Sequence, residues 1–91
     1  MNLLAKEDFE KRMIAFIQEE LFEEDIKISP EQTLESIGVQ SIELMELIFF
    51  IEREFNFKLK ASSLSAENLK SVSALANEVY RLCSQEELAL A

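Results

Sequence analysis

Residues 41–55 form an apolar segment with the periodicity of a single α-helix. At about 100° per residue, five apolar side chains gather on one side of this helix. They form the expected core stripe: Leu44, Leu47, Ile48, Ile51 and Phe55. The opposite side carries Ile42, Met45 and Phe49, together with Glu46 and Arg53. Because an apolar strip edged by charge is typical of a binding surface, we expect a partner to cover it. The alternative is that another segment of this chain does so.

Turn-forming residues are scarce in this chain, which favours long helices. Gly and Pro occur once each among 91 residues, while 48% of the residues are hydrophobic. An all-β fold would need more turn residues, and a disordered chain would be less hydrophobic. A chain of this length forms one domain that buries roughly 60–70% of the surface exposed when it is unfolded. We therefore predict a single domain over residues 1–91, with a core over about 5–83 and a frayed tail at 84–91.

Two further segments have helical periodicity. The first spans about residues 5–23, with apolar positions along one face at Phe9, Met13, Phe16, Ile17 and Leu21. Acidic residues between 19 and 25 should end it, because the helix dipole disfavours negative charge at a C-terminus. A last helix should begin after Ser71, which is a favoured N-cap residue. Its apolar positions are Val72, Leu75, Ala76, Val79, Leu82 and Cys83, and Leu69 should pack beside its start.

The connections between these helices differ in character. Residues 24–40 form a long first loop. Four apolar residues should hold this loop against the core: Ile26, Ile28, Leu34 and Ile37. Residues 29–32 have the pattern of a helix start and predict a single turn, and Gly38 allows the chain to turn again. Residues 56–60 should be extended, and the Ser-rich residues 61–68 can form only a short helix. The predicted fold class is therefore all-α: a small four-helix bundle with three main helices, a long first loop and a short third helix.

The acidic charge is concentrated in the first part of the chain. There are 9 basic and 18 acidic residues, for a net charge of −9. Residues 1–40 contribute −6 and residues 41–55 contribute −3, whereas residues 56–91 are neutral. Such a field argues against nucleic acid and anionic membranes as partners and favours proteins that present Lys and Arg; the alternative is that it serves solubility alone. A calcium sensor would need an Asp-x-Asp-x-Asp-Gly loop, which the sequence lacks.

The sequence contains no recognisable catalytic site of its own. There is no His, one Cys, and no cluster of polar residues that could serve together as acid, base and nucleophile. With Cys83 as the single cysteine, no internal disulfide can form, which fits a reducing compartment. Residues 1–8 become charged too early for the apolar core of a signal peptide, and no segment reaches transmembrane length. We therefore expect a cytoplasmic protein.

The residues around Ser41 have a more specific pattern. Gly38 and Ser41 stand in the sequence Gly-Val-Gln-Ser-Ile-Glu, and the helix that follows ends in Ile-Glu-Arg-Glu-Phe at residues 51–55. With the long first loop and the weak third helix, this pattern resembles the acyl carrier protein family over about residues 9–82. The resemblance implies that phosphopantetheine from coenzyme A is attached to Ser41 and carries acyl groups as thioesters. It also implies a non-catalytic carrier for fatty-acid, polyketide or related lipid biosynthesis, without identifying the acyl group.

The resemblance implies partners as well. A phosphopantetheinyl transferase would load Ser41, and acyl-loading, synthase or acyltransferase enzymes with basic docking patches would bind the exposed face of the central helix of a monomeric carrier. The partner-binding residues are then Gln40, Ile42, Glu43, Met45, Glu46, Phe49 and Glu52. A helix N-terminus, with unpaired N–H groups and a partial positive charge, is a suitable place for a phosphodiester. From the acidic charge, the lack of a calcium-loop pattern and the lack of a segment of transmembrane length, we expect no metal site, no nucleic-acid partner and no membrane insertion.

Two positions depart from the family pattern. The residue before the serine is usually Asp but is Gln40 here, and Arg53 replaces an acid in the last turn of the helix. With the bulky Phe49, these changes suggest a specialised, free-standing carrier. Two alternatives remain open: Ser41 could be an ordinary helix cap, and the chain could be a helical adaptor that keeps the carrier shape without the prosthetic group. Ser36, in the preceding loop, is a weaker candidate for modification.

Overall fold

A computed structural model describes residues 5–22 and 26–90, with side chains as far as Ser84. This part of the chain contains four α-helices: α1 (Lys6–Phe16), α2 (Leu34–Ile37), α3 (Ile42–Phe55) and α4 (Val72–Leu90). A π-helical segment, η1 (Ile17–Leu21), continues α1, and a 3₁₀ turn, η2 (Ala61–Ser63), lies between α3 and α4. The predicted all-α fold with four helices is confirmed. No described helix has the length and apolar character needed to cross a membrane.

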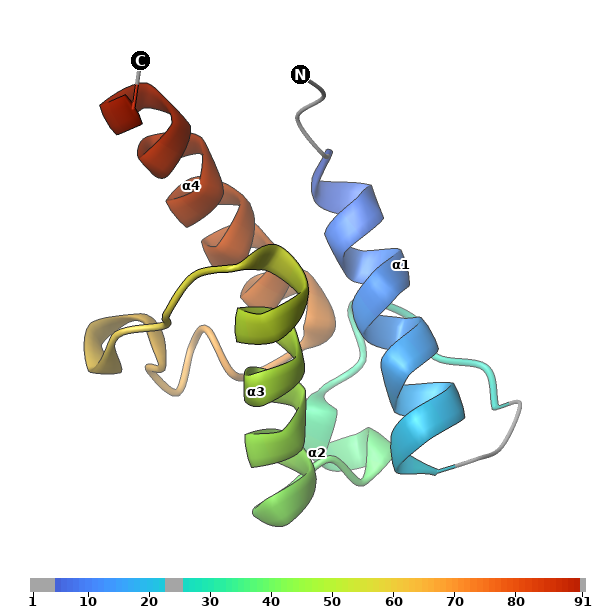
Figure 1. Cartoon of the computed structure of the whole chain (residues 1–91). Helices are drawn as coiled ribbons and strands as arrows, with labels where there is room; N and C mark the ends of the chain where they lie inside the picture. Colours follow the sequence, from blue (N-terminus) through green and yellow to red (C-terminus); the bar gives the residue numbers. More distant parts are fainter. Residues whose placement is uncertain (1–4, 23–25, 91) are drawn as a thin grey trace.

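Helices α1, α3 and α4 surround one hydrophobic core. Figure 1 shows α1 lying along α4, and α1 also contacts α3. The largest fully buried side chains come from these helices, α2 and η1: Met13, Ile17, Leu34, Leu47, Ile51, Val72, Leu75 and Val79. Each contributes about 1.5–3 kcal/mol by leaving water. The predicted core stripe of α3 is confirmed, with Leu47 and Ile51 fully buried and its other members packed against the core.

The first helix follows the prediction as far as Leu21. Its last turn is π-helical, and the N–H of Phe22 donates to the carbonyl of Ile17 at 3.1 Å. The predicted end at residue 23 and the acidic residues 24 and 25 lie outside the described residues. Residues 1–4, part of the segment from which a signal peptide was judged absent, also lie outside the described residues.

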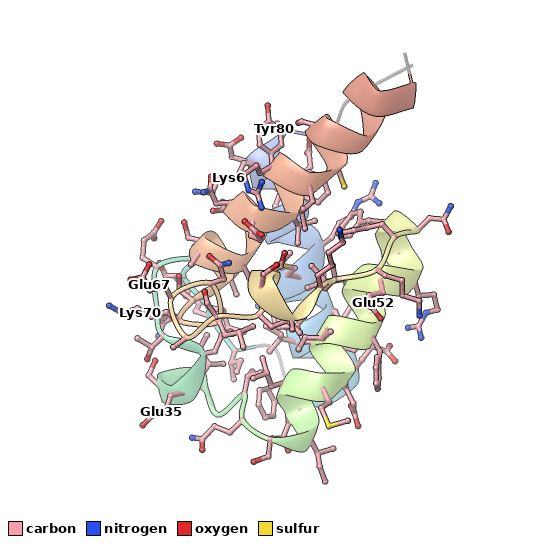
Figure 2. All side chains as sticks on the ribbon, turned by 90° about the vertical axis from the view of Figure 1, so that its left-hand side faces the viewer. Lys6, Glu35, Glu52, Glu67, Lys70 and Tyr80 are labelled. Atoms are coloured by element: carbon pink, nitrogen blue, oxygen red, sulfur yellow. The ribbon has the colours of Figure 1, made fainter. Side chains whose placement is uncertain are left out.

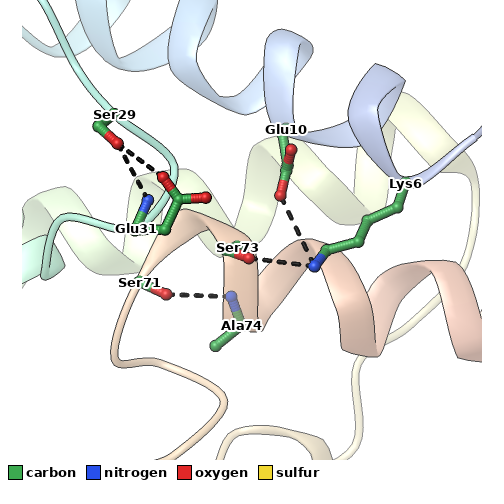
Figure 3. Close-up of polar contacts among 7 residues, drawn as sticks. All are labelled: Lys6, Glu10, Ser29, Glu31, Ser71, Ser73 and Ala74. Atoms are coloured by element: carbon green, nitrogen blue, oxygen red, sulfur yellow. Dashed lines mark hydrogen bonds and ion pairs between the residues drawn. The ribbon is translucent and has the colours of Figure 1, made fainter.

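The long first loop is pinned to the start of α4. The N–H of Leu34 donates to the carbonyl of Lys70 at 2.8 Å, and the N–H of Ser73 donates to the carbonyl of Pro30 at 2.8 Å. From the other side, Lys6 Nζ at the start of α1 donates to Ser73 Oγ at 3.0 Å (Figure 3). The two backbone bonds therefore tie the loop to the start of α4, and Ser73 also links α4 to the start of α1.

The short helix α2 was not predicted. It begins where Thr33 Oγ1 accepts the N–H of Ser36 at 3.1 Å, and its residue Leu34 is buried. Four residues are too few to show a helical period in the sequence, so α2 depends on this cap and on burial. The turn predicted at residues 29–32 is present just before it, closed by a bond from the N–H of Gln32 to the carbonyl of Ser29 at 3.1 Å.

The second half of the chain agrees with the prediction except in two places. The short third helix expected at 61–68 is reduced to η2. The Asn68 side-chain amide donates to the carbonyl of Ser63 at 2.9 Å, in place of a continuing helical bond. The last helix was expected to end near residue 83, but the backbone of α4 is helical to Leu90. Its final residues are good helix formers with no Gly or Pro to stop them. The domain limits remain a prediction.

Candidate functional site

Ser41 lies at the junction between α2 and α3, which local contacts hold in place. Gly38 ends α2 in the left-handed region with φ of 101°, and its N–H donates to the carbonyls of Leu34 and Glu35, both at 3.1 Å. The next residue, Val39, is buried in the core. With Gly38 and Val39 fixed, the chain projects at Gln40 and Ser41, which are both exposed.

The Ser41 hydroxyl is not used to start the helix that it precedes. Its backbone has φ of 52° and ψ of −111° instead of the extended conformation of a usual N-cap, and its side chain accepts no capping bond. Only backbone bonds close the first turn: the N–H of Glu43 donates to the carbonyl of Gln40 at 3.1 Å, and the N–H of Met45 donates to the carbonyl of Ser41 at 3.0 Å. The interpretation of Ser41 as an ordinary capping serine is therefore wrong.

The backbone of Ser41 is strained. A positive φ with this ψ is common only for glycine, and such conformations cost on the order of 1–3 kcal/mol and cluster at functional sites. Asn56, the other non-glycine residue with positive φ in the described chain, has φ of 57° and ψ of 56°, the left-handed conformation that Asn tolerates. The strain at Ser41 thus accompanies a hydroxyl that makes no capping bond, at a helix end that favours phosphate.

Ser36, the weaker candidate, is already engaged. It is exposed, but its hydroxyl donates to the carbonyl of Thr33 at 2.8 Å, and its N–H donates to the Thr33 hydroxyl. These two bonds belong to the cap of α2. Modification of Ser36 would therefore disturb a helix start, whereas modification of Ser41 would break no capping bond.

The apolar strip on α3 is exposed, as its helical angle predicts. The exposed fractions are 68% for Ile42, 55% for Met45 and 54% for Phe49. Beside the strip, Glu46 is exposed and Glu43 is partly buried. The alternative that another segment of the chain covers the strip is wrong for the residues that the structure describes. The roles of these residues in partner binding remain a prediction.

Glu52 has a structural contact that the sequence did not reveal. Its Oε2 accepts the N–H of Leu59 at 2.8 Å, and its side chain is only 16% exposed. Figure 2 labels Glu52 on α3, where it holds the segment that follows the helix. The bond joins residues seven positions apart across a turn, so no helical period signals it. Of the predicted partner-binding residues, Glu52 is the one whose carboxylate is already occupied by a backbone N–H.

Ring contacts and an ion pair join α3 to α1. The rings of Phe16 and Phe50 stack with centroids 4.3 Å apart, and Arg12 forms an ion pair with Glu54 at 3.0 Å. The stack adds about 0.5–1.5 kcal/mol beyond burial, whereas the exposed ion pair adds little. They orient α3 so that its apolar strip faces outward.

One buried carboxylate supports the loop that follows α3. Glu78 on α4 is 8% exposed, and the Arg81 guanidinium donates to its two oxygens at 2.7 and 3.0 Å. The hydrogen bond from Arg81 lowers the pKa of Glu78, and a hydrogen bond with Ser63 adds to this effect. Because Ser63 belongs to η2, its hydrogen bond with Glu78 links α4 to the segment between α3 and α4. Among the described residues, no group of three His, Cys, Asp or Glu side chains is placed to hold a metal ion.

Comparison with known proteins connects this geometry to a family. Residues 11–79 match the family described as "Phosphopantetheine attachment site". Aminoacyl carrier protein 1 of Bradyrhizobium diazoefficiens (strain USDA 110) is 31% identical over 48 residues, which is 53% of this chain and 53% of that protein. The chain therefore matches only about half the length of this curated relative.

A solved structure shares the fold. It is a chain in the crystal structure of Bradyrhizobium japonicum glycine:[carrier protein] ligase complexed with glycylated carrier protein. The TM-score is 0.66 and the identity 22%, over 80% of this chain and 96% of that chain. At this identity the likeness concerns the fold alone. The family match, by contrast, includes α2, α3 and the junction at Ser41, and from it we conclude that this chain belongs to the phosphopantetheine attachment site family, as a non-catalytic carrier domain.

Proposed function

We propose that Ser41 takes the phosphopantetheine group and that the carrier transports an amino acid as a thioester. The observation that carries the proposal is the exposed Ser41 hydroxyl, which makes no capping bond at the start of α3. When bound, the group supplies a thiol on a flexible arm, to which a carboxyl group is joined as a thioester. The contribution of this chain is to present Ser41 Oγ for phosphate ester formation and to hold the phosphate at the positive end of α3.

Three other serines in the described chain are less suitable. Ser71 caps α4, Ser36 belongs to the cap of α2, and Ser63 is buried. Modification at any of these would remove a structural bond or require burial of a charged phosphate, which is costly. Ser41 avoids both penalties.

An amino acid is a better candidate cargo than the fatty-acyl or polyketide groups implied by the resemblance to acyl carrier proteins. The similar Bradyrhizobium protein is an aminoacyl carrier, and the similar solved chain is a glycylated carrier. The packing of the core supports the same choice, since Met13, Leu47 and Leu75 are fully buried. A long acyl chain could enter this core only if the helices separated, whereas a short polar amino acid gains nothing by leaving water.

The proposed partners are a phosphopantetheinyl transferase and an ATP-dependent amino acid ligase. Glu43 and Glu46 would attract basic patches on these enzymes, and Ile42, Met45 and Phe49 would supply the apolar contact. Gln40 is exposed and lacks the charge of the usual Asp, so a transferase that pairs with an acid at this position would bind less tightly. We propose that the carrier works as a cytoplasmic monomer.

The attachment site is tested by intact mass. The wild type, Ser41→Ala and Ser36→Ala are incubated with coenzyme A and a broad-specificity phosphopantetheinyl transferase. We expect a gain of one phosphopantetheine in the wild type and in Ser36→Ala, and no gain in Ser41→Ala. A gain in Ser41→Ala would contradict the assignment. No gain in any of the three, also after Gln40→Asp, would favour the helical adaptor that lacks the group.

The cargo is tested on the loaded protein. The Bradyrhizobium glycine:[carrier protein] ligase, ATP and an amino acid are added, and a fatty acid with an acyl carrier protein synthetase serves as the comparison. We expect the mass of an aminoacyl group to be added, and this addition to be reversed by hydroxylamine because thioesters are cleaved by it. Efficient acylation by the fatty acid with no aminoacylation would contradict the proposed cargo while leaving the role of Ser41 intact.

A further inference from the structure

A surface depression of about 720 Å³ lies at the C-terminal end of α3. Its lining comes from the end of α3 and from the extended segment that follows: Phe49, Glu52, Arg53, Asn56, Phe57, Lys58 and Lys60. Phe49 is also the last residue of the exposed apolar strip. The strip that starts beside Ser41 therefore continues into this depression, which is walled by two aromatic side chains and rimmed by charge.

The charge at this end of α3 has the opposite sign to that of the molecule. The chain has a net charge of −9, yet the depression carries Arg53, Lys58 and Lys60, which we call the basic corner, against a single acid. That acid, Glu52, gives one oxygen to the N–H of Leu59. Its ion pair with Lys58 is long, at 3.9 Å, and the Lys58 side chain is 90% exposed, so the pair is weak. Arg53 and Lys60 are exposed and form no ion pair within the described chain.

The Ser41 end of the same helix is acidic. Glu43 and Glu46 lie there without a basic residue in the first two turns of α3. Glu46 and Arg53 are seven residues apart, about 10 Å along the axis at 1.5 Å per residue. This exceeds the Debye length of about 8 Å at physiological ionic strength. A docking protein therefore meets two separate charges of opposite sign, one at each end of the apolar strip.

We propose that this face of α3 is a bipolar docking surface for a partner protein that presents acidic side chains beside an apolar one to the basic corner. The same partner places basic side chains near Glu43 and Glu46, next to Ser41. This inference rests on the proposed carrier function and specifies the class of partner surface. Because the two ends of the strip carry opposite charges, a partner that contacts both ends can bind α3 in one orientation only. Ser41 then lies beside the basic part of the partner's surface. A uniformly acidic helix could not distinguish the two directions.

The occupant is another protein and not a second copy of this chain. Two copies could pair α3 antiparallel, acidic end against basic corner. However, stable dimers bury about 800 Å² on each partner, and here the apolar contact would be three side chains on one helix. A small apolar centre with charged ends suits a transient partner, in which charges set the encounter and its orientation.

The test uses ¹⁵N-labelled protein and two peptides. One is an amphipathic acidic peptide of Glu-Glu-Leu-Phe repeats, and the other has Lys in place of Glu. We expect the acidic peptide to shift the amide signals of Phe49, Arg53 and residues 57–60, and the basic peptide to shift those of Glu43 and Glu46. The triple variant R53E/K58E/K60E should bind the acidic peptide at least about fivefold more weakly. The control K11E/K27E/K70E, with the same change in net charge at other exposed lysines, should bind it normally.

Several results would overturn the proposal. One is that the two triple variants lose affinity for the acidic peptide equally. The others are that this peptide shifts amide signals mainly near other lysines, or shifts none. Dimerisation of the wild type through α3 in sedimentation would also overturn it, since the occupant would then be a second copy. Circular dichroism checks that both variants fold. Loading of Ser41, measured by mass on the same variants, is a separate result: if Ser41 is not loaded but the acidic peptide binds as expected, the carrier function fails and the bipolar surface stands.

Discussion

Ser71 and Ser41 both stand immediately before a long helix, yet their hydroxyl groups are used differently. Ser71 Oγ accepts the N–H of Ala74 at 3.0 Å, in the usual N-cap bond (Figure 3). Ser41 is exposed, has φ of 52° and accepts no such bond. One hydroxyl stabilises the fold, while the other remains available for a phosphate ester at the expense of a strained backbone. Residue type and position are the same, so backbone geometry decides what each serine can do.

The largest stability effect should come from the turn that leads to Ser41. Gly38→Ala should lower the free energy of unfolding by about 1–2 kcal/mol, because Gly38 has φ of 101° and Ala is strained there. The added Cβ would lie 3.5 Å from Phe22 Cζ, an ordinary contact, so the cost is in the backbone. Gly38→Asn is the control and should cost less, since Asn tolerates this conformation. Urea unfolding measures both, and an equal cost would point to side-chain packing instead.

Removing the two hydroxyl groups tests the comparison directly. Ser71→Ala should lower the free energy of unfolding by about 1 kcal/mol through loss of a cap. Ser41→Ala should change it by less than about 0.5 kcal/mol, because no capping bond is lost. Loading by the transferase should show the reverse pattern, intact in Ser71→Ala and absent in Ser41→Ala. Equal destabilisation by the two substitutions would mean that Ser41 caps α3 in solution.

Glycine at the same two positions should have opposite effects. Ser41→Gly relieves the positive φ and should raise the free energy of unfolding by about 0.5–1 kcal/mol. Ser71 has no positive φ for glycine to relieve, and Ser71→Gly removes a capping hydroxyl. This substitution should therefore lower the free energy of unfolding by a few tenths of a kcal/mol. Thermal unfolding of both variants under the same conditions makes the comparison. A loss of stability in Ser41→Gly would show that the backbone of Ser41 is not strained.

The smallest predicted effect is the loss of stability at low pH that arises from Glu78. The pKa of Glu78 is lowered in the folded protein by its bonds to Arg81 and Ser63. Its contribution to stability is therefore present above the unfolded pKa of about 4.3 and is lost as pH falls through the lower folded pKa. Unfolding measured from pH 7 to pH 3 should show this loss in the wild type and a shallower fall in Glu78→Gln. Parallel curves for the two proteins would contradict the assigned shift.

Much of the fold followed from local patterns. The core stripe of α3, its exposed strip and the Ser71 cap were predicted correctly, because a helical period or a capping residue encodes each within a few positions. The predictions failed where the cause is distant or short. Helix α2 has only four residues, and the expected helix at 61–68 is reduced to a three-residue turn, after which the Asn68 side chain donates to the Ser63 carbonyl. The end of α4 was placed too early because the polar residues 84–87 interrupt the apolar pattern, although they do not stop the helix.

The candidate site divides in the same way. The Gly-x-x-Ser pattern and the acidic and apolar residues on α3 were visible in the sequence, and they predicted the family that the comparisons confirm. The engagement of Glu52 with Leu59 was not visible, nor was the depression at the basic corner. Both depend on how the segment after α3 folds back on the helix.

The sequence by itself determined the three long helices, their buried faces and the position of Ser41, because these depend on periodicity and on motifs within a few residues. Only the tertiary structure decided that Ser41 leaves its hydroxyl out of the helix cap and that Arg53, Lys58 and Lys60 share one depression. The physical reason is that a hydroxyl's hydrogen bonds are set by backbone dihedral angles, and a shared surface is set by contacts between segments. Neither the hydrogen bonds of one hydroxyl nor the surface shared by separate segments can be read from the residue type at a single position.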